Sequence, residues 1–181
     1  VGAEMVRATK RLQDTLPGVK AIVRQSHSAD LIQAVLDGAL DFAIVTYDGE
    51  LFEPDIVRER VGDNPVVVAA RVDHPLARRK ALRPAAIAGE PWIVPRRDNV
   101  FRSRLETLFT RHSLDRPVIL AESSGVLFTL AYLRTHDALT YIPRRVLLSA
   151  GGVRDFAVLP GRGFDWRPQA LLGRRPIGRA H

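Results

Sequence analysis

The stretch of sequence that decides the fold runs from Pro17 to Val45 and reads PGVKAIVRQSHSADLIQAVLDGALDFAIV. Residues 19–25 are rich in β-branched side chains, which favour a strand. Residues 28–37 carry apolar side chains at helical spacing, and a glycine follows them as a stop signal. Residues 41–45 are mostly apolar, as in a buried parallel strand. Together they predict a strand, a helix and a strand, which is a βαβ unit.

A second unit of the same kind is predicted farther along the chain. An amphipathic helix over 99–112 lies between predicted strands at 92–95 and 117–121. A polar turn precedes this helix, as one precedes the helix of the first unit. Residues 65–70 are apolar at every position, which predicts a central strand. We therefore expect two small α/β halves that face one ligand. The other predicted elements are helices over 2–15, 84–89 and 126–133, and strands over 56–60, 138–142, 155–160 and 169–174.

Length and composition fit a globular protein of one domain or two small lobes. The chain has 181 residues and no cysteine, which excludes disulfides, thiolate nucleophiles and cysteine-ligated zinc. It has no run of 18 apolar residues, and its first residues lack the pattern of a signal peptide. We expect a cytoplasmic protein without a membrane span.

The positive charge of the chain, a net +7, is dispersed along the sequence. Its arginine pairs are scattered and have no aromatic residues between them, which favours a solvated surface over a nucleic-acid face.

Residue patterns typical of enzymes are missing from the sequence. The five histidines show no metal-ligand spacing, and no glycine-rich loop has the form of a phosphate or dinucleotide site. We therefore predict no catalytic residues, no metal and no cofactor, and hence not an enzyme.

Five segments carry a resemblance to a known family. In order, they are PGV at 17–19, LIQAVLDGALDFAI at 31–44, DHPLARR at 73–79, AGEPWIVP at 88–95 and ALTYIPR at 138–144. Their order and spacing resemble the effector-binding domain of LysR-type transcriptional regulators, although no single segment is specific.

The resemblance implies a periplasmic-binding-protein-like type II fold. This α/β fold has two subdomains joined by crossover strands, with a ligand cleft between them. We expect subdomain I over 1–67, subdomain II over 68–143, and a return to subdomain I over 144–181, with the crossings near 65–71 and 168–174. Family members bind DNA through an N-terminal helix-turn-helix domain, which we expect to be absent from this chain.

The candidate effector-binding residues stand in turns at strand ends, where open α/β sheets collect ligands. They are His27, Ser28, Thr46, Asp98, Asn99, Val100, Ser123 and Ser124.

Each candidate also has an ordinary structural role. Ser28 and Asn99 can cap their helices or bind an effector. His27 can pair with a carboxylate or simply be solvated. Asp98 would repel an anion, although Arg96 and Arg97 can offset its charge.

The sequence therefore predicts the sensor domain of a bacterial transcription factor that binds an organic acid or a sugar derivative. The resemblance implies a homodimer or tetramer in which the helix near 3–15 packs against the helix near 99–112 of a partner. Leu105 and Phe109 would then cover the first helix. Two alternatives stay open: the solute-binding receptor of a transport system, and a transferase built on the same fold.

Overall fold

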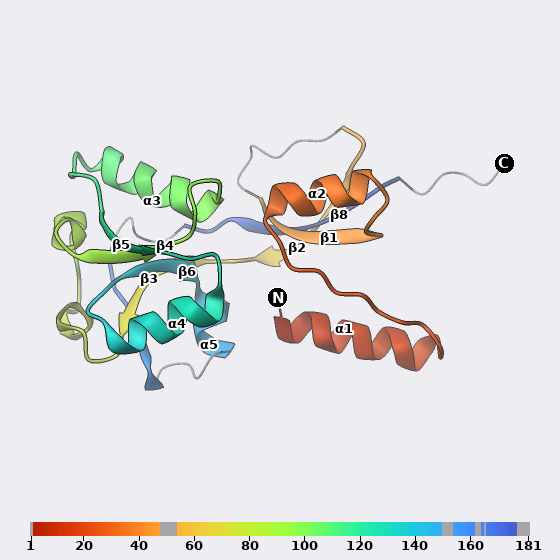
Figure 1. Cartoon of the computed structure of the whole chain (residues 1–181), viewed down its shortest axis with the longest axis horizontal. Coiled ribbons are helices and arrows are strands. Elements are labelled where there is room, and N and C mark those ends of the chain that lie inside the picture. Colours follow the sequence, from red (N-terminus) through yellow and green to blue (C-terminus); the bar gives the residue numbers. More distant parts are fainter. Residues whose placement is uncertain (1, 48–53, 150–153, 162–163, 165, 177–181) are drawn as a thin grey trace. The chain divides into compact units, whose positions relative to one another are not determined.

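The computed structural model describes residues 2–47, 54–149, 154–161, 164 and 166–176. The chain divides into two compact units. Unit 1 comprises Val1–Val61 with Ala170–His181, and unit 2 comprises Gly62–Gln169. Both units contain helices and strands, which confirms the predicted α/β class (Figure 1). Within the described part of the chain, no helix is long and apolar enough to cross a membrane.

Unit 1 is built on a three-stranded sheet in the order β1-β8-β2. Its strands are β1 (Phe42–Tyr47), β2 (Val57–Asp63), which runs just past the unit boundary, and β8 (Gln169–Arg174); its helices are α1 (Gly2–Thr15) and α2 (Ser28–Leu36). The apolar stripe of α2 packs on the sheet in a core cluster of Ile32, Val35, Ala43, Val45, Ile56 and Leu171. The helix and the second strand of the first βαβ unit are therefore confirmed.

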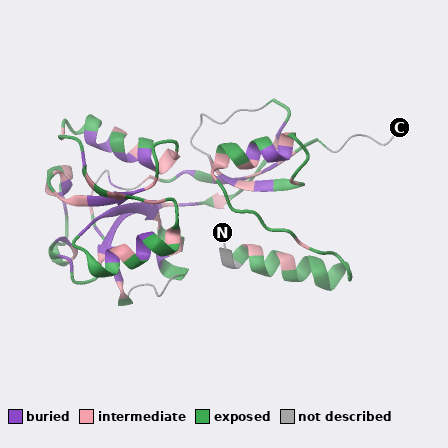
Figure 2. Cartoon of the chain, in the orientation of Figure 1, coloured by how far each residue is buried: buried purple, intermediate pink, exposed green. Residues whose placement is uncertain are grey.

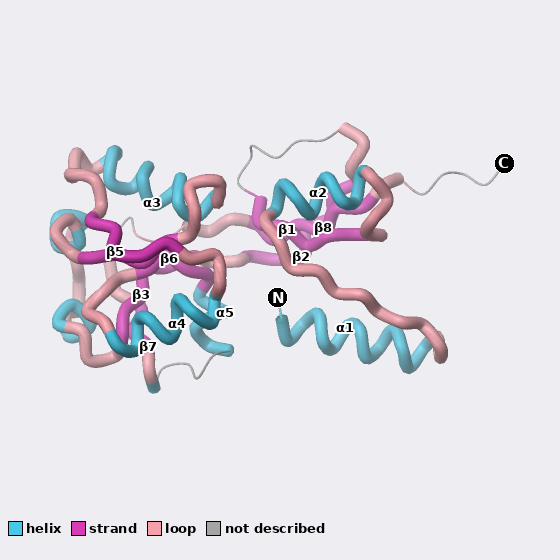
Figure 3. Tube along the Cα trace, viewed as in Figure 1, coloured by secondary structure: helices cyan, strands magenta, loops and turns pink. Residues whose placement is uncertain are grey.

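The predicted strand over 19–25 is wrong. These residues form a loop between α1 and α2 (Figure 3). Ile22 and Val23 are 79% and 68% exposed. A strand needs a neighbour for its backbone N–H and C=O groups, and none of the described strands pairs with this segment. The β-branched composition was a local signal that the tertiary structure does not use.

Unit 2 has β3 (Val66–Arg71) as its central strand, as predicted. β3 pairs antiparallel with β6 (Thr140–Pro143) on one side and β7 (Phe156–Val158) on the other. β4 (Pro91–Val94) pairs in parallel with β5 (Val118–Glu122), so β4-α3-β5 is the second βαβ unit. A parallel bridge between Trp92 and Leu139 joins the two groups of strands.

Helices cover both faces of these strands. α3 (Val100–Arg111) packs on one face, and α4 (Val126–Thr135) and α5 (Arg144–Ser149) pack on the other. Two short 3-10 helices, η1 (Pro75–Arg78) and η2 (Pro84–Ile87), lie on the α3 side. Figure 2 shows the buried residues concentrated along the strands between these layers.

The expected boundaries of the second subdomain need correction. Residues 144–169 were expected to return to subdomain I, but they belong to unit 2. The reason is a non-local pairing, because β7 completes the sheet beside β3. Likewise, β3 lies wholly in unit 2 and is not a crossing strand. The unit boundaries fall instead within β2, after Val61, and at the start of β8, after Gln169.

The expected role of Leu105 and Phe109 in a dimer contact is also wrong. Leu105 and Phe109 are 0% and 2% exposed. Both side chains belong to the core of unit 2, where Phe109 packs against Trp92. They are therefore not available to cover a helix of another subunit.

Candidate functional site

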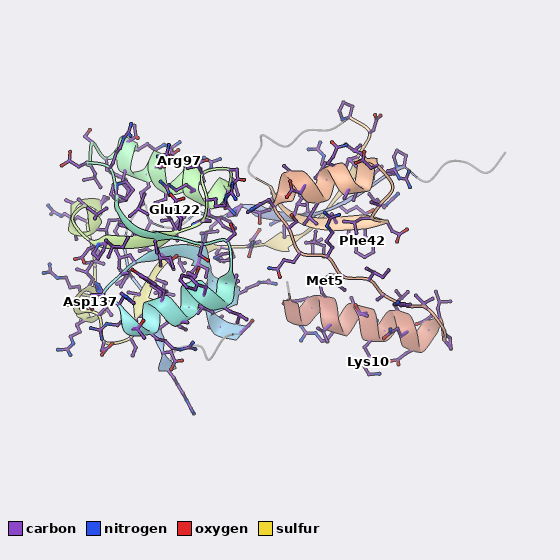
Figure 4. The ribbon with its side chains drawn as sticks, viewed as in Figure 1. Met5, Lys10, Phe42, Arg97, Glu122 and Asp137 are labelled. Carbon is purple, nitrogen blue, oxygen red and sulfur yellow. The ribbon has the colours of Figure 1, made fainter. Side chains whose placement is uncertain are left out.

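The parallel pairing of β4 with β5 brings two polar turns to one edge of unit 2. Val94, the last residue of β4, pairs with Glu122, the last residue of β5. The Ser123 N–H then donates to the Val94 carbonyl at 2.9 Å. Both turns therefore start from the same edge and lead into α3 and α4. Figure 4 labels Glu122 on this edge and Arg97 in the turn before α3.

The first turn ends at Asn99, which caps α3 as expected. Its Oδ1 accepts a hydrogen bond from the Phe101 N–H at 2.9 Å. Its carbonyl accepts from the Arg102 N–H, also at 2.9 Å. Val100 begins the helix and is half-buried. Because Oδ1 is engaged in the cap, an effector would meet other atoms of this turn.

Asp98 stands in the same turn with its side chain 59% exposed. The Arg96 Nε lies 3.9 Å from Asp98 Oδ1, which is a loose, solvated ion pair. The expected offset of this negative charge by a neighbouring arginine is therefore present but weak.

The second turn comprises Ser123, Ser124 and Gly125. The Gly125 N–H donates to Ser123 Oγ at 3.1 Å, which closes the turn locally. Gly125 is the N-cap residue of α4, and no side chain caps this helix. Ser124 is exposed. Ser123 therefore shapes the turn and does not cap the helix.

The remaining candidates lie in unit 1, before α2 and at the end of β1. His27, half-buried, occupies the N-cap position of α2 but makes no side-chain cap. Ser28 is the first helical residue, so it does not cap α2, which was one of the two roles considered for it. Its Oγ points instead to the Thr46 carbonyl at 3.5 Å. The structure thus brings Ser28 and Thr46 together, across 18 positions of sequence.

Comparison with known proteins identifies the family. The profile of the LysR substrate binding domain matches residues 4–175. The chain belongs to this family. The LysR resemblance stated from the sequence is confirmed.

Individual relatives agree with this LysR assignment. The chain is 26% identical over 165 residues to the HTH-type transcriptional regulator GbpR of Azospirillum brasilense, an alignment that covers 89% of the chain and 48% of GbpR. It spans about half the length of the curated relatives it matches.

Solved structures of LysR domains show the same fold. The CcmR regulatory domain of Synechocystis PCC6803 in complex with 2-PG has a TM-score of 0.86 at 20% identity, over 99% of this chain and 85% of that chain. The effector binding domain of QuiR in complex with shikimate has a TM-score of 0.76 at 17% identity, with the same coverage.

The sequence patterns did not predict the buried arginine of this LysR domain. Arg102, on α3, is buried with its side chain 3% exposed, and it pairs with Glu106 and Glu122. A signal was present, because Arg102 precedes Leu105 and Phe109 by three and seven positions, on the apolar face of the helix. An arginine on that stripe needs partners in the interior.

The described residues of this LysR domain contain no cluster of three or more histidine, cysteine, aspartate or glutamate side chains that could hold a metal ion. The chemistry available at the two turns is hydrogen bonding by backbone amides, hydroxyls and a carboxamide. Such groups bind and orient a polar molecule.

Proposed function

We propose that this domain senses a small metabolite on behalf of a bacterial LysR-type transcriptional regulator. The effector contacts the turns at Ser28, Asn99 and Ser123. Binding then shifts the balance between two arrangements of the protein, which requires different affinities for the two. We assign no reaction to the domain.

The observation that carries this proposal is the shared edge of β4 and β5. Two polar turns leave one edge there, each opening a helix, and both stand where ligands of α/β sheets collect. In unit 1, the contact between Ser28 and Thr46 supplies polar groups at the corresponding strand end.

The class of effector is an organic acid or a sugar derivative. Shikimate, held by the similar QuiR domain, is a hydroxylated carboxylic acid. Arginine and aspartate side chains occur together in the turn before α3, so that turn does not favour an ion of one sign. Hydroxyl groups suit the remaining donors and acceptors.

The activity of the whole regulator follows as a proposal from its relatives. GbpR is named as an HTH-type regulator, and this chain matches 48% of it. We infer that DNA is bound by a helix-turn-helix domain outside this chain, in the cytoplasm.

Assembly is proposed as a homodimer or tetramer. Leu12 of α1 is 42% exposed, and Leu127 and Phe128 of α4 are 83% and 57% exposed. These side chains replace Leu105 and Phe109 as our candidates for the contact between subunits.

Calorimetric titration with a panel of organic acids and sugars tests the proposed function. For a compound that binds, Ser28→Ala and Asn99→Ser should each weaken binding by about 0.5–1.5 kcal/mol, or up to about 3 kcal/mol for a charged effector. Asn99→Ser keeps a capping oxygen, so the helix is preserved. Unchanged affinity in both variants would place the site elsewhere.

The transport-receptor alternative is not favoured, because the family and the curated relatives are those of regulators. Localisation of the full protein at the chromosome in cells would separate the two.

A further inference from the structure

The buried arginine of unit 2 joins the two turns of the candidate site. Arg102 Nη1 donates to Glu122 Oε1 at 3.1 Å, and Arg102 Nε donates to Glu106 Oε1 at 2.7 Å. Glu122 ends β5 and is followed directly by Ser123. The backbone N–H of Arg102 donates to the carbonyl of Asn99. One residue therefore contacts the Asn99 turn through its main chain and the residue before the Ser123 turn through its side chain.

The two glutamates differ in what they connect. Glu106 lies four positions after Arg102 on the same helix, so this pair stays within α3. Glu122 lies on another element, 20 positions away, so this pair ties α3 to the end of β5. Their side chains are about equally exposed, at 50% and 45%. They form a matched pair in which only one partner links the turns.

Stability alone does not explain a buried arginine at this point. Removing a guanidinium from water is costly, and apolar side chains of similar volume are often as stabilising as a buried ion pair. What the arginine adds is geometry, because its planar fork directs N–H groups to two carboxylates at once.

We propose that Arg102 is a positioning residue that holds the Ser123 turn at a set place relative to the Asn99 turn. This inference rests on the proposed function, since these turns are the effector-binding turns of unit 2. Arg102 acts through Glu122 and needs no contact with the effector.

Amide hydrogen exchange in the ligand-free chain tests the positioning directly. The Ser123 N–H, bonded to Val94, reports on one turn, and the Phe101 N–H, bonded to Asn99 Oδ1, reports on the other. Arg102→Met and Glu122→Ala should each accelerate exchange of the Ser123 amide by about tenfold or more through local opening. Both should leave the thermal unfolding midpoint within about 5 °C of the wild type.

Glu106→Ala is the control, because it removes a carboxylate from the same arginine without parting the turns. It should leave exchange at Ser123 and Phe101 unchanged. If Arg102→Met does not fold, Glu122→Ala carries the comparison. Unchanged exchange in Glu122→Ala, or equal acceleration in Glu106→Ala, would overturn the inference.

Titration with shikimate supplies a second measurement. If the wild type binds it, Arg102→Met and Glu122→Ala should weaken binding about tenfold or more, and Glu106→Ala less than about twofold. Equal losses in Glu122→Ala and Glu106→Ala would count against positioning. Lack of binding by the wild type would count against the proposed effector class, while amide exchange still decides the role of Arg102.

Discussion

Phe109 of α3 packs edge-on against Trp92 of β4, with ring centroids 5.8 Å apart and ring planes at 77°. Aromatic pairs prefer this geometry, because the positive ring edge meets the negative ring face. The contact commits the apolar face of α3 to its own sheet. The apolar side chains available to another subunit must therefore come from other elements.

Truncation of Leu105 tests whether the apolar face of α3 packs in the core of unit 2. Leu105 is fully buried in the same cluster, so Leu105→Ala should lower the free energy of unfolding by about 2–5 kcal/mol. The exposed Leu148 of α5 is the control, and Leu148→Ala should change the free energy of unfolding by less than about 0.5 kcal/mol. Chemical denaturation measures both. Equal effects would show that α3 is not held as the structure describes.

Self-association should depend on the exposed apolar side chains. Leu12→Asp in α1 should weaken the dimer, since it places a charge in an apolar contact. Sedimentation measured over a range of concentrations follows the change. Lys10→Gln, on an exposed position of the same helix, is the control and should leave association nearly intact. A wild-type chain that stays monomeric at high concentration would contradict the proposed assembly.

Loss of the cap at Asn99 should destabilise α3. Asn99→Ala removes the bond from the Phe101 N–H and should cost about 1 kcal/mol of stability. Asn99→Ser and Asn99→Asp retain a capping oxygen and should cost less. Denaturant midpoints for the three variants give the ranking. A stability for Asn99→Ala equal to that of the wild type would mean that the cap contributes nothing.

The ion pair of Arg71 with Asp73 predicts a pH dependence. The hydrogen bond from the Arg71 guanidinium holds the pKa of Asp73 below its ordinary value of 3.8. The folded state thus binds this proton less readily than the unfolded state. The stabilisation of the folded state by this ion pair is present above pH 3.8. It is lost as the pH falls through the lower pKa that Asp73 has in the folded state.

Thermal unfolding from pH 6 to pH 2 checks this dependence. Asp73→Asn should be less stable than the wild type near pH 6, and the difference should shrink toward pH 2. Asp115→Asn is the control, because Asp115 is exposed and has no ion pair with any described residue. A difference between Asp73→Asn and the wild type that does not vary with pH would refute the linkage.

A glycine between α2 and β1 should resist substitution. Gly38 has φ +76°, which side chains rarely adopt, and an added Cβ would lie 3.2 Å from the Arg175 guanidinium. Gly38→Ala should therefore cost about 1–2 kcal/mol. Gly89→Ala, in open space and without a positive φ, should be neutral or slightly stabilising. Thermal unfolding midpoints measure the stability of both variants. An equal loss of stability in Gly38→Ala and Gly89→Ala would contradict this prediction.

Sequence by itself determined the features that depend on neighbouring residues. Periodicity predicted α2 and α3, because an amphipathic helix carries its pattern within a few turns. Continuous apolar character predicted β3 as the central strand, since both its faces are covered. Asn99 was expected as a cap because the cap bond spans only two positions.

Only the tertiary structure decided what depends on distant partners. Residues 19–25 have strand-forming side chains, but a strand exists only when another strand supplies its hydrogen bonds. Residues 144–169 belong to unit 2 because β7 pairs with β3, and no local pattern encodes that pairing. The bond from Arg102 to Glu122 likewise joins a helix to a strand. Local physics sets helices and turns, whereas sheet partners and buried ion pairs depend on which segments the whole chain brings into contact.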